Sequence, residues 1–522
     1  MNTLGISTTS PTSPTSPTST TSTTPTTSTA RDVLVVFAIS LLVTVPLVVV
    51  HFPMGQDLPA HIETAAQILA LWRDDDVVGA RYLLHQLPWP NALPTMVLAA
   101  LMTVMDALPA ARLLTGVGLA LWPTSLALLC ARLGRAPLWA LLALPTTYDL
   151  AFAYGFFHFV VGKPLWTLVI AHAAHAARTD RRGPYVLLAL LLPLLFCTHL
   201  LLGLSAAALA VIVVLVLADS WRRRWAGLVA CLVGTLPALM WMQSQPPTPA
   251  GTAVMLPLDQ AVDRLWANLG DLAADSSDAL PWQVAGVIIV VAVVVMVVRP
   301  EPRRRWLTRD SLLLVLLGTL TLLFALLGPI RTAQASVVAE RFSSLGVAVL
   351  VLLPPVVTSG RRSSRRALMA VGVVIAVLMA RGTTARWQAF NDDEMGDFEH
   401  LLKQIPTSAV VATHFVRPLS THGHYNVLWH WPKLVALRGG VTDDSFAFRA
   451  TCVVGLKFGA QPPRRRPLRT NEAFTLAGLA GFDHLLVQGT EARVDAAVRR
   501  GVLTPVTSTG VWQLLRVNHR QP

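Results

Sequence analysis

The chain has 522 residues, of which 53% are hydrophobic and 14% charged, and its formal net charge is +13. A soluble protein is about 25% charged, so this chain has too few polar residues to cover the cores that its length would need. Its apolar residues come instead in runs of roughly 15 to 20, long enough to cross a bilayer as a helix. Four cysteines are too few for a secreted disulfide scaffold. The composition excludes a soluble enzyme and predicts a membrane protein.

Basic residues outnumber acidic ones by 42 to 29. Much of this excess lies in short arginine clusters between apolar runs, a pattern typical of cytoplasmic loops in membrane proteins. We therefore expect the lipid bilayer, and not a nucleic acid, to be the partner of the basic residues. The clusters lie at Arg132–Arg135, Arg178–Arg182, Arg222–Arg224, Arg299–Arg309 and Arg361–Arg366.

The N-terminal residues 1–30 are rich in Ser, Thr and Pro, which predicts a disordered cytoplasmic tail. A first span follows, from about Asp32 to Val50. If every arginine cluster faces the cytoplasm, each interval between clusters must hold an even number of spans. This threading predicts about 11 spans within a transmembrane domain at 31–380, with the N-terminus inside and the C-terminus outside.

One stretch, Leu93–Leu108, is apolar enough to span but would invert the topology of everything after it. We expect it to be a short or membrane-skimming helix in the first external loop, at about 51–112. Counting it would raise the total to about 12 or 13 spans. A tight hairpin with its apex near His199 and a turn near Tyr148–Phe157 are also expected.

The composition changes after Arg381, and the region 386–522 contains no run long enough to span. Short apolar stretches there predict buried strands, and two further segments have helical spacing. We therefore expect a small external α/β domain at the C-terminus. The predicted strands are Ala409–Ala412, His484–Gln488 and Val511–Val517, and the predicted helices are Phe398–Ile405 and Thr490–Arg500.

Several ionisable residues beside apolar runs all fall on the predicted external side. Ionisable groups at membrane depth are costly and usually mark a site or a buried ion pair. Their convergence on one side is what an external active site for a lipid-linked substrate would need. The candidates are Asp57, His61, Glu63, Asp149, His158, His199, Arg331, Glu340 and Arg341.

Several of these residues also have structural alternatives. Asp57 could be a solvated loop residue or the N-cap of a helix that begins near Leu58. His199 could simply hydrogen-bond a neighbouring helix. Glu340 could form a structural ion pair with Arg341, its neighbour in sequence.

Two short motifs resemble a known family. Gly55-Gln-Asp57-Leu-Pro-Ala-His61 is similar to the first external loop of the GT-C superfamily of membrane glycosyltransferases, and Tyr154-Gly-Phe-Phe-His-Phe-Val-Val-Gly162 resembles a stretch in uncharacterised bacterial members. The resemblance covers 31–380 and, loosely, the C-terminal region. It implies a polytopic enzyme that takes sugar from a polyprenyl phosphate on the outer face of the membrane.

The resemblance also implies roles for individual residues. Asp57 would be the general base that takes a proton from an acceptor hydroxyl. Arg341, or Arg331 in its place, would hold the lipid phosphate with two parallel hydrogen bonds. His61 and His199 would be secondary donors. The motif departs from the family at His158, where an asparagine is expected, and it lacks an Asp-x-Asp pair, so we do not expect direct metal ligation by the first loop.

Four histidines, His414, His422, His424 and His430, lie close together in the C-terminal region. Zinc would need three or four ligands held tetrahedrally, and no cysteine accompanies these histidines. A polar loop that caps the membrane site is the expected alternative. A divalent cation therefore stays open as a cofactor, and no cofactor is assigned.

The sequence as a whole predicts a bacterial inner-membrane enzyme. It would transfer a sugar from a polyprenyl-phosphate donor to a glycan, lipid or protein acceptor, by an inverting displacement with a carboxylate base. The alternatives are a transporter or flippase of lipid-linked glycans, for which internal repeats would be expected, and a non-catalytic membrane assembly protein.

Overall fold

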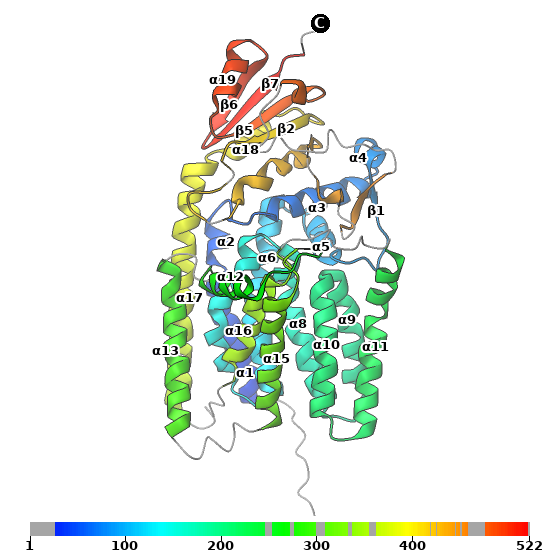
Figure 1. Ribbon diagram of the computed structural model, residues 1–522, viewed down its shortest axis with the longest axis vertical. Helices are drawn as coiled ribbons and strands as arrows, with labels where there is room; N and C mark the ends of the chain where they lie inside the picture. Colours follow the sequence, from blue (N-terminus) through cyan, green and yellow to red (C-terminus); the bar gives the residue numbers. More distant parts are fainter. Residues whose placement is uncertain are drawn as a thin grey trace, which may run out of the picture.

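The computed structural model describes residues 27–245, 253–271, 276–298, 308–331, 337–353, 362–417, 419–423, 425–443, 445–448, 452–457 and 476–519. Most of the expected N-terminal tail and His424 lie outside these described residues. The chain forms a bundle of long helices with a small sheet domain beyond one end of it (Figure 1).

The helical bundle follows the apolar runs of the sequence. Its helices are α1 (Thr27–Val43), α2 (Val45–Val49), α6 (Ala107–Arg132), the 3-10 helix η1 (Pro137–Thr146), α7 (Leu150–Ala153), α8 (Phe157–Ala176), α9 (Arg182–Thr198), α10 (Leu200–Leu217), α11 (Trp221–Ser244), α12 (Leu258–Asp271), α13 (Ser276–Val298), α15 (Arg309–Leu327), η2 (Glu340–Phe342), α16 (Ser343–Val351) and α17 (Arg362–Phe390). The predicted first span is interrupted at Thr44, between α1 and α2. The expected hairpin apex does fall at His199, between α9 and α10.

Six helices of the described part are long and apolar enough to cross a membrane: Ala107–Arg132, Phe157–Ala176, Leu200–Leu217, Trp221–Ser244, Arg309–Leu327 and Ser363–Met395. Other apolar helices are shorter, so the total of about 11 spans stays a prediction. The outer face of α11 exposes large apolar side chains at helical spacing, each at least 43% exposed, which suits contact with acyl chains. They are Val229, Leu232, Val233, Leu236 and Met240. The chain is a polytopic α-helical membrane protein.

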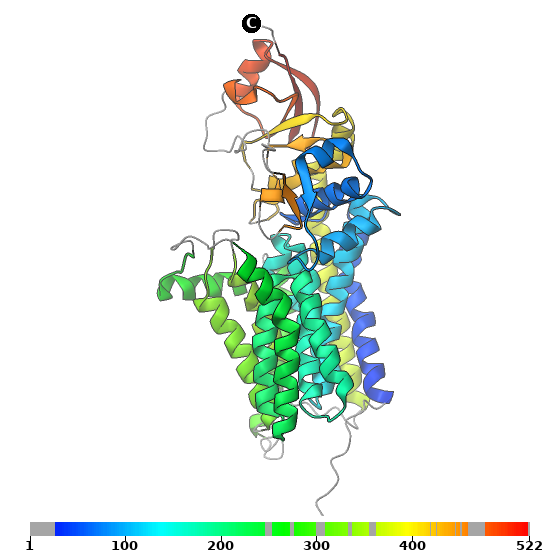
Figure 2. The ribbon, with the colours of Figure 1, turned by 90° about the vertical axis from the view of Figure 1, so that its right-hand side faces the viewer.

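The arginine clusters meet at one end of the bundle. Arg223 pairs with Asp180 at 2.6 Å, and Arg309 pairs with Asp219 at 2.5 Å. Arg178 also forms an ion pair with Asp310. In Figures 1 and 2 the α10–α11 turn lies at the end opposite the sheet domain. Arg178, Arg223 and Arg309 therefore share one end, as the threading requires, while residues 299–307 and Arg361 of the predicted clusters lie outside the described part of the chain.

The predicted first external loop folds into short elements over the other end of the bundle. They are α3 (Leu58–Trp72), α4 (Asp76–Arg81), β1 (Tyr82–Leu84) and α5 (Leu93–Leu101). The apolar stretch Leu93–Leu108 is not one continuous helix, because α5 ends at Leu101 and α6 begins at Ala107. The nine residues of α5 are too few to cross a bilayer.

The C-terminal region forms an α/β domain. Its elements are η3 (Asn391–Met395), α18 (Phe398–Lys403), β2 (Val410–Phe415), η4 (Val427–Arg438), β3 (Val441–Thr442), η5 (Phe446–Phe448), β4 (Val454–Leu456), η6 (Leu476–Leu479), β5 (His484–Gln488), α19 (Ala492–Arg499), β6 (Leu503–Thr509) and β7 (Trp512–Val517). The strands form a sheet in the order β3-β2-β5-β7-β6, parallel from β3 to β5 and antiparallel beyond, while β4 pairs with β1 of the first loop.

The first loop lies between the bundle and the sheet, and both views show it there (Figures 1 and 2). Helix η4 packs along α3, and the β1–β4 pair ties the loop to the C-terminal domain a second time. A single apolar cluster joins the two parts, with Leu58 and Ile62 from α3 and Trp431 and Leu434 from η4. The loop and the domain therefore form one body above the bundle.

Candidate active site

A cavity between the first loop and the bundle gathers five of the nine predicted site residues. We call it the central cavity, and it holds about 670 Å³ of empty space, part of it open to solvent. The side chains come from the start of α3, the start of α8, the α9–α10 break and η2. They are Asp57, His61, His158, His199 and Arg341.

The two motifs that resemble the glycosyltransferase family pack directly against each other. The backbone N–H of Asp57 donates to the Tyr154 carbonyl at 3.0 Å. Gly155 has a φ of +69°, and a Cβ atom there would lie 2.5 Å from the Asp57 nitrogen. Only glycine allows both the left-handed backbone and this approach. The glycine of the second motif thus sets the position of the acid in the first.

Asp57 is 5% exposed and sits at the N-cap position of α3, but its side chain makes no capping hydrogen bond. Instead, Oδ1 lies 3.3 Å from Nε2 of His430 and accepts a 3.5 Å hydrogen bond from Gln56. The capping alternative therefore does not account for this residue.

The cavity histidines have different partners. His158 hydrogen-bonds the hydroxyl of Thr95 at 2.5 Å, and its ring meets that of His61 edge-on, with centroids 4.4 Å apart. Nδ1 of His199 accepts a 3.3 Å hydrogen bond from the backbone N–H of Leu202. His199 therefore caps the start of its own helix, α10, while its ring borders the cavity.

Arg341 is 8% exposed and its guanidinium lies over the Phe156 ring, 3.4 Å from the centroid. Its Nε donates to the Val337 carbonyl at 2.7 Å. The neighbouring Glu340 pairs with Arg264 at 2.6 Å. Arg341 borders the central cavity and Glu340 does not. The ion pair of Glu340 is therefore formed with Arg264 and not with its neighbour Arg341.

Glu63 lies behind the cavity wall and is 2% exposed. Its carboxylate is 3.6 Å from the Lys433 ammonium, and Gln67 donates to it at 3.4 Å. Burial, and secondly the Glu63 charge, raise the pKa of the nearby Tyr82 to about 12, so that phenol stays protonated at neutral pH. Glu63 belongs to a buried polar network between α3 and η4.

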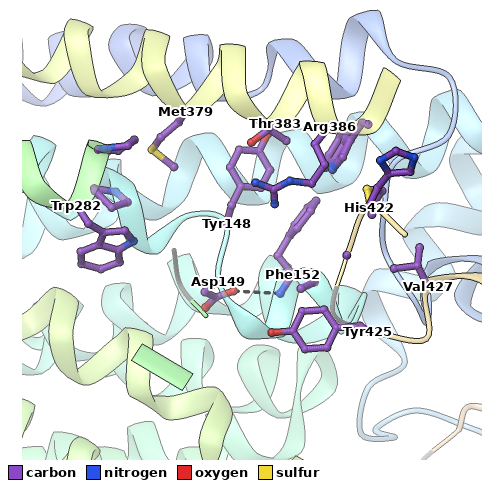
Figure 3. A pocket seen from close by; sticks show the side chains of 16 residues that line it. Tyr148, Asp149, Phe152, Trp282, Met379, Thr383, Arg386, His422, Tyr425 and Val427 are labelled. Atoms are coloured by element: carbon purple, nitrogen blue, oxygen red, sulfur yellow. Dashed lines mark hydrogen bonds between the residues drawn. The ribbon is translucent and has the colours of Figure 1, made fainter. Parts of the chain in front are cut away.

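Asp149 borders a second cavity, which we call the lateral cavity, with about 770 Å³ of empty space, part of it open to solvent. Figure 3 shows this cavity between α17, Trp282 of α13 and the segment around Tyr425, with Arg386 reaching toward Tyr148. The carboxylate of Asp149 is engaged on both oxygens: it caps Phe152 at 3.0 Å and pairs with the fully buried Lys163 at 3.1 Å.

Arg331 stands apart from these groups. Its side chain is exposed, its backbone pairs with Val254, and it does not border the central cavity. The C-terminal histidines are also dispersed: His414 pairs with Glu491, and His422 with Asp393 at 2.9 Å. No group of three possible metal ligands occurs in the described part of the chain.

Three of the predicted acids have basic partners that were not predicted for them: His430, named only among the clustered histidines, and the lysines Lys433 and Lys163. One signal was available. Arginine carries nearly all the positive charge of this chain, so each of its few lysines is conspicuous. Lys163, within an apolar run, and Lys433, three residues after the last of the clustered histidines, were candidates for buried pairs on that ground.

No protein-family model matches the chain, and no curated protein matches its sequence. Solved structures do match. ArnT from Cupriavidus metallidurans bound to undecaprenyl phosphate is similar over 93% of this chain and 97% of ArnT, with a TM-score of 0.55 and 17% identity. The apo state of the same protein is similar over 94% of this chain and 98% of ArnT, with a TM-score of 0.54 and 15% identity. At these identities the match shows a shared fold, so the chain has an ArnT-like fold.

Proposed function

We propose that the chain is a membrane glycosyltransferase that moves a sugar from a polyprenyl phosphate to an acceptor hydroxyl. The observation that carries this proposal is the central cavity, where a carboxylate, an arginine and three histidines border one space. A displacement at an anomeric carbon needs a base for the acceptor and a cation for the leaving phosphate. Asp57 and Arg341 supply these two groups.

In the proposed reaction Asp57 takes the proton from the acceptor hydroxyl. The acceptor oxygen forms a bond to the anomeric carbon from the face opposite the phosphate, and the bond from that carbon to the phosphate oxygen breaks. The electron pair leaves with the polyprenyl phosphate, so the anomeric configuration inverts. The Arg341 guanidinium would stabilise the negative charge of the leaving group.

The lipid donor has support from the structural neighbour, since one of the matching ArnT structures is bound to undecaprenyl phosphate. A two-substrate reaction also needs room for two ligands. The lateral cavity, with Arg386 and His422 among aromatic side chains, offers a second space for an amphiphilic substrate. No metal enters the proposed mechanism, and the sugar and the acceptor are left open.

The site would face the outside of a bacterial inner membrane, because the arginine clusters gather at the opposite end of the bundle. Single cysteines at Ser508 in β6 and Ser363 in α17, both exposed, test this orientation. A membrane-impermeant maleimide should label position 508 in intact cells and position 363 only after lysis, against a background without the native cysteines. Labelling of position 363 alone in intact cells would show that the chain has the opposite orientation in the membrane.

The transfer itself can be tested with purified protein in nanodiscs, an undecaprenyl-phosphate sugar labelled on the sugar, and a membrane extract as the source of acceptor. We expect release of undecaprenyl phosphate together with transfer of label, and loss of both with Asp57→Asn. Movement of the labelled lipid across the bilayer without cleavage of the sugar–phosphate bond would instead support a flippase.

A further inference from the structure

The helix η4 presents two basic side chains to the acids at the start of the first loop. In a 3-10 helix, residues three apart lie one above the other on the same face. His430 and Lys433 have this spacing, and both are buried, with 7% and 3% exposure. His430 meets Asp57 and Lys433 meets Glu63, at 3.3 Å and 3.6 Å. The C-terminal domain thus contacts both acids of the first loop.

The contacts of Asp57 are asymmetric. His430 approaches Oδ1, and Gln56 donates to the same oxygen. Within the described residues, Oδ2 receives no hydrogen bond, and Asp57 borders the central cavity. A carboxylate whose one oxygen is held by donors keeps its other oxygen available as a base, in a fixed direction.

The ring of Phe446 holds this arrangement together. Its centroid lies 5.4 Å from the His430 ring, 5.6 Å from the His61 ring and 5.5 Å from the Lys433 ammonium. Phe446 also borders the central cavity, so it separates the Lys433–Glu63 pair from that space. The Lys433–Glu63 pair therefore holds η4 against α3 outside the central cavity. His430 does not line the cavity itself but contacts Asp57, which does.

We propose that His430 is a positioning residue for the transfer reaction. With its proton on Nε2, it donates to Oδ1 of Asp57 and directs Oδ2 at the acceptor. When the acceptor O–H bond breaks, the new bond is Oδ2–H, and the imidazole proton stays on His430. This inference rests on the proposed function and deepens it, because the C-terminal domain becomes part of the active site and not only a cover for it.

The test compares His430→Ala and His430→Gln in otherwise unchanged protein, in nanodiscs with the labelled undecaprenyl-phosphate sugar. We expect His430→Ala to lower kcat about 10- to 100-fold, the range for a lost hydrogen bond to a charged group, with the KM for the donor lipid almost unchanged. His430→Gln keeps an N–H donor and should recover most of the rate. A role in folding alone would not produce this split or this rescue.

A double-variant cycle makes the test sharper. If His430 acts only through the base, His430→Ala should slow the parent but cause no further loss of rate in the Asp57→Asn background. His414→Ala is the matched control, since His414 is a buried histidine of the same domain that pairs with Glu491. We expect it to leave kcat of the folded protein at the parent value.

The failures are distinguishable. A parent protein without transfer activity would remove the proposed function and this inference with it. Active parent and inactive Asp57→Asn, combined with a parent-like kcat in His430→Ala, would overturn the inference alone. An equal loss from His430→Ala in both backgrounds would also overturn it, because the histidine would then act independently of Asp57. If His430→Ala does not fold, the test falls to His430→Gln. A loss of kcat of about 10- to 100-fold in that variant, which keeps the N–H donor, would overturn the inference.

Discussion

Asp57 and Asp149 looked alike in the sequence, since each lies beside an apolar run on the predicted external side, but their surroundings differ. Asp149 is neutralised by Lys163, caps α7 and accepts from Ser344, so both of its oxygens are engaged. Asp57 makes its side-chain contacts through Oδ1 at the edge of a cavity. Burial alone therefore does not mark a catalytic acid. Among the described contacts, Asp57 therefore keeps one oxygen for the proposed role as a base, whereas Asp149 does not.

The largest expected effect is kinetic and falls on Asp57. Asp57→Asn should lower turnover by roughly 10²- to 10⁴-fold, the usual result of removing a general base. The melting temperature should hardly change, because Asn and Asp are equally good at the N-cap position and the native side chain makes no capping bond. Rates of transfer and thermal unfolding of the same preparation give both values. Near-normal turnover would remove Asp57 from the mechanism.

The next effect concerns stability and falls on the Asp149–Lys163 pair. Lys163→Met leaves a buried carboxylate without its countercharge and should cost about 3 to 5 kcal/mol. Adding Asp149→Asn should restore most of that loss, since replacing both members of a buried pair is often close to neutral. Unfolding of the two single variants and the double variant measures the coupling. Additive losses would show that the two charges do not depend on each other.

A smaller effect is expected for the arginine that borders the central cavity. Arg341→Lys loses the planar fork and the stacking on Phe156, and should weaken binding of undecaprenyl phosphate by about 1 to 3 kcal/mol. The matched control is Arg264→Lys, one helix away, whose guanidinium pairs with Glu340 outside the cavity. Titration of both purified variants and the parent with undecaprenyl phosphate measures the three affinities, and only that of Arg341→Lys should fall. Equal affinity in Arg341→Lys and the parent would end the phosphate assignment.

The smallest effect is expected at Arg331, which the sequence offered as the alternative to Arg341 for binding the lipid phosphate. Its side chain is exposed and does not border the central cavity, so Arg331→Ala should change stability and lipid affinity by less than about 0.5 kcal/mol. The same titration and unfolding measurements apply. A loss of lipid binding comparable to that of Arg341→Lys would move the phosphate site toward the loop before η2.

Local patterns in the sequence were enough for much of the fold. Apolar runs predicted the helices, and the break at His199 between α9 and α10 falls where a tight hairpin was expected. In the C-terminal domain β2, β5, β7, α18 and α19 lie where short apolar runs and helical spacing predicted them. Strand β6 was missed because it is an edge strand, with exposed residues and a bulge at Pro505 that hide the alternation.

The sequence by itself determined that this chain is a membrane protein, and it marked the ionisable residues beside apolar runs, Asp57 and Arg341 among them, as candidates. These properties depend on composition and on periodicity over a few turns. Only the tertiary structure decided which of these residues share a space. Asp57 and His430 are far apart in the chain, and their contact depends on η4 packing along α3. No local pattern encodes that packing, because it results from the burial of apolar surface between two distant segments.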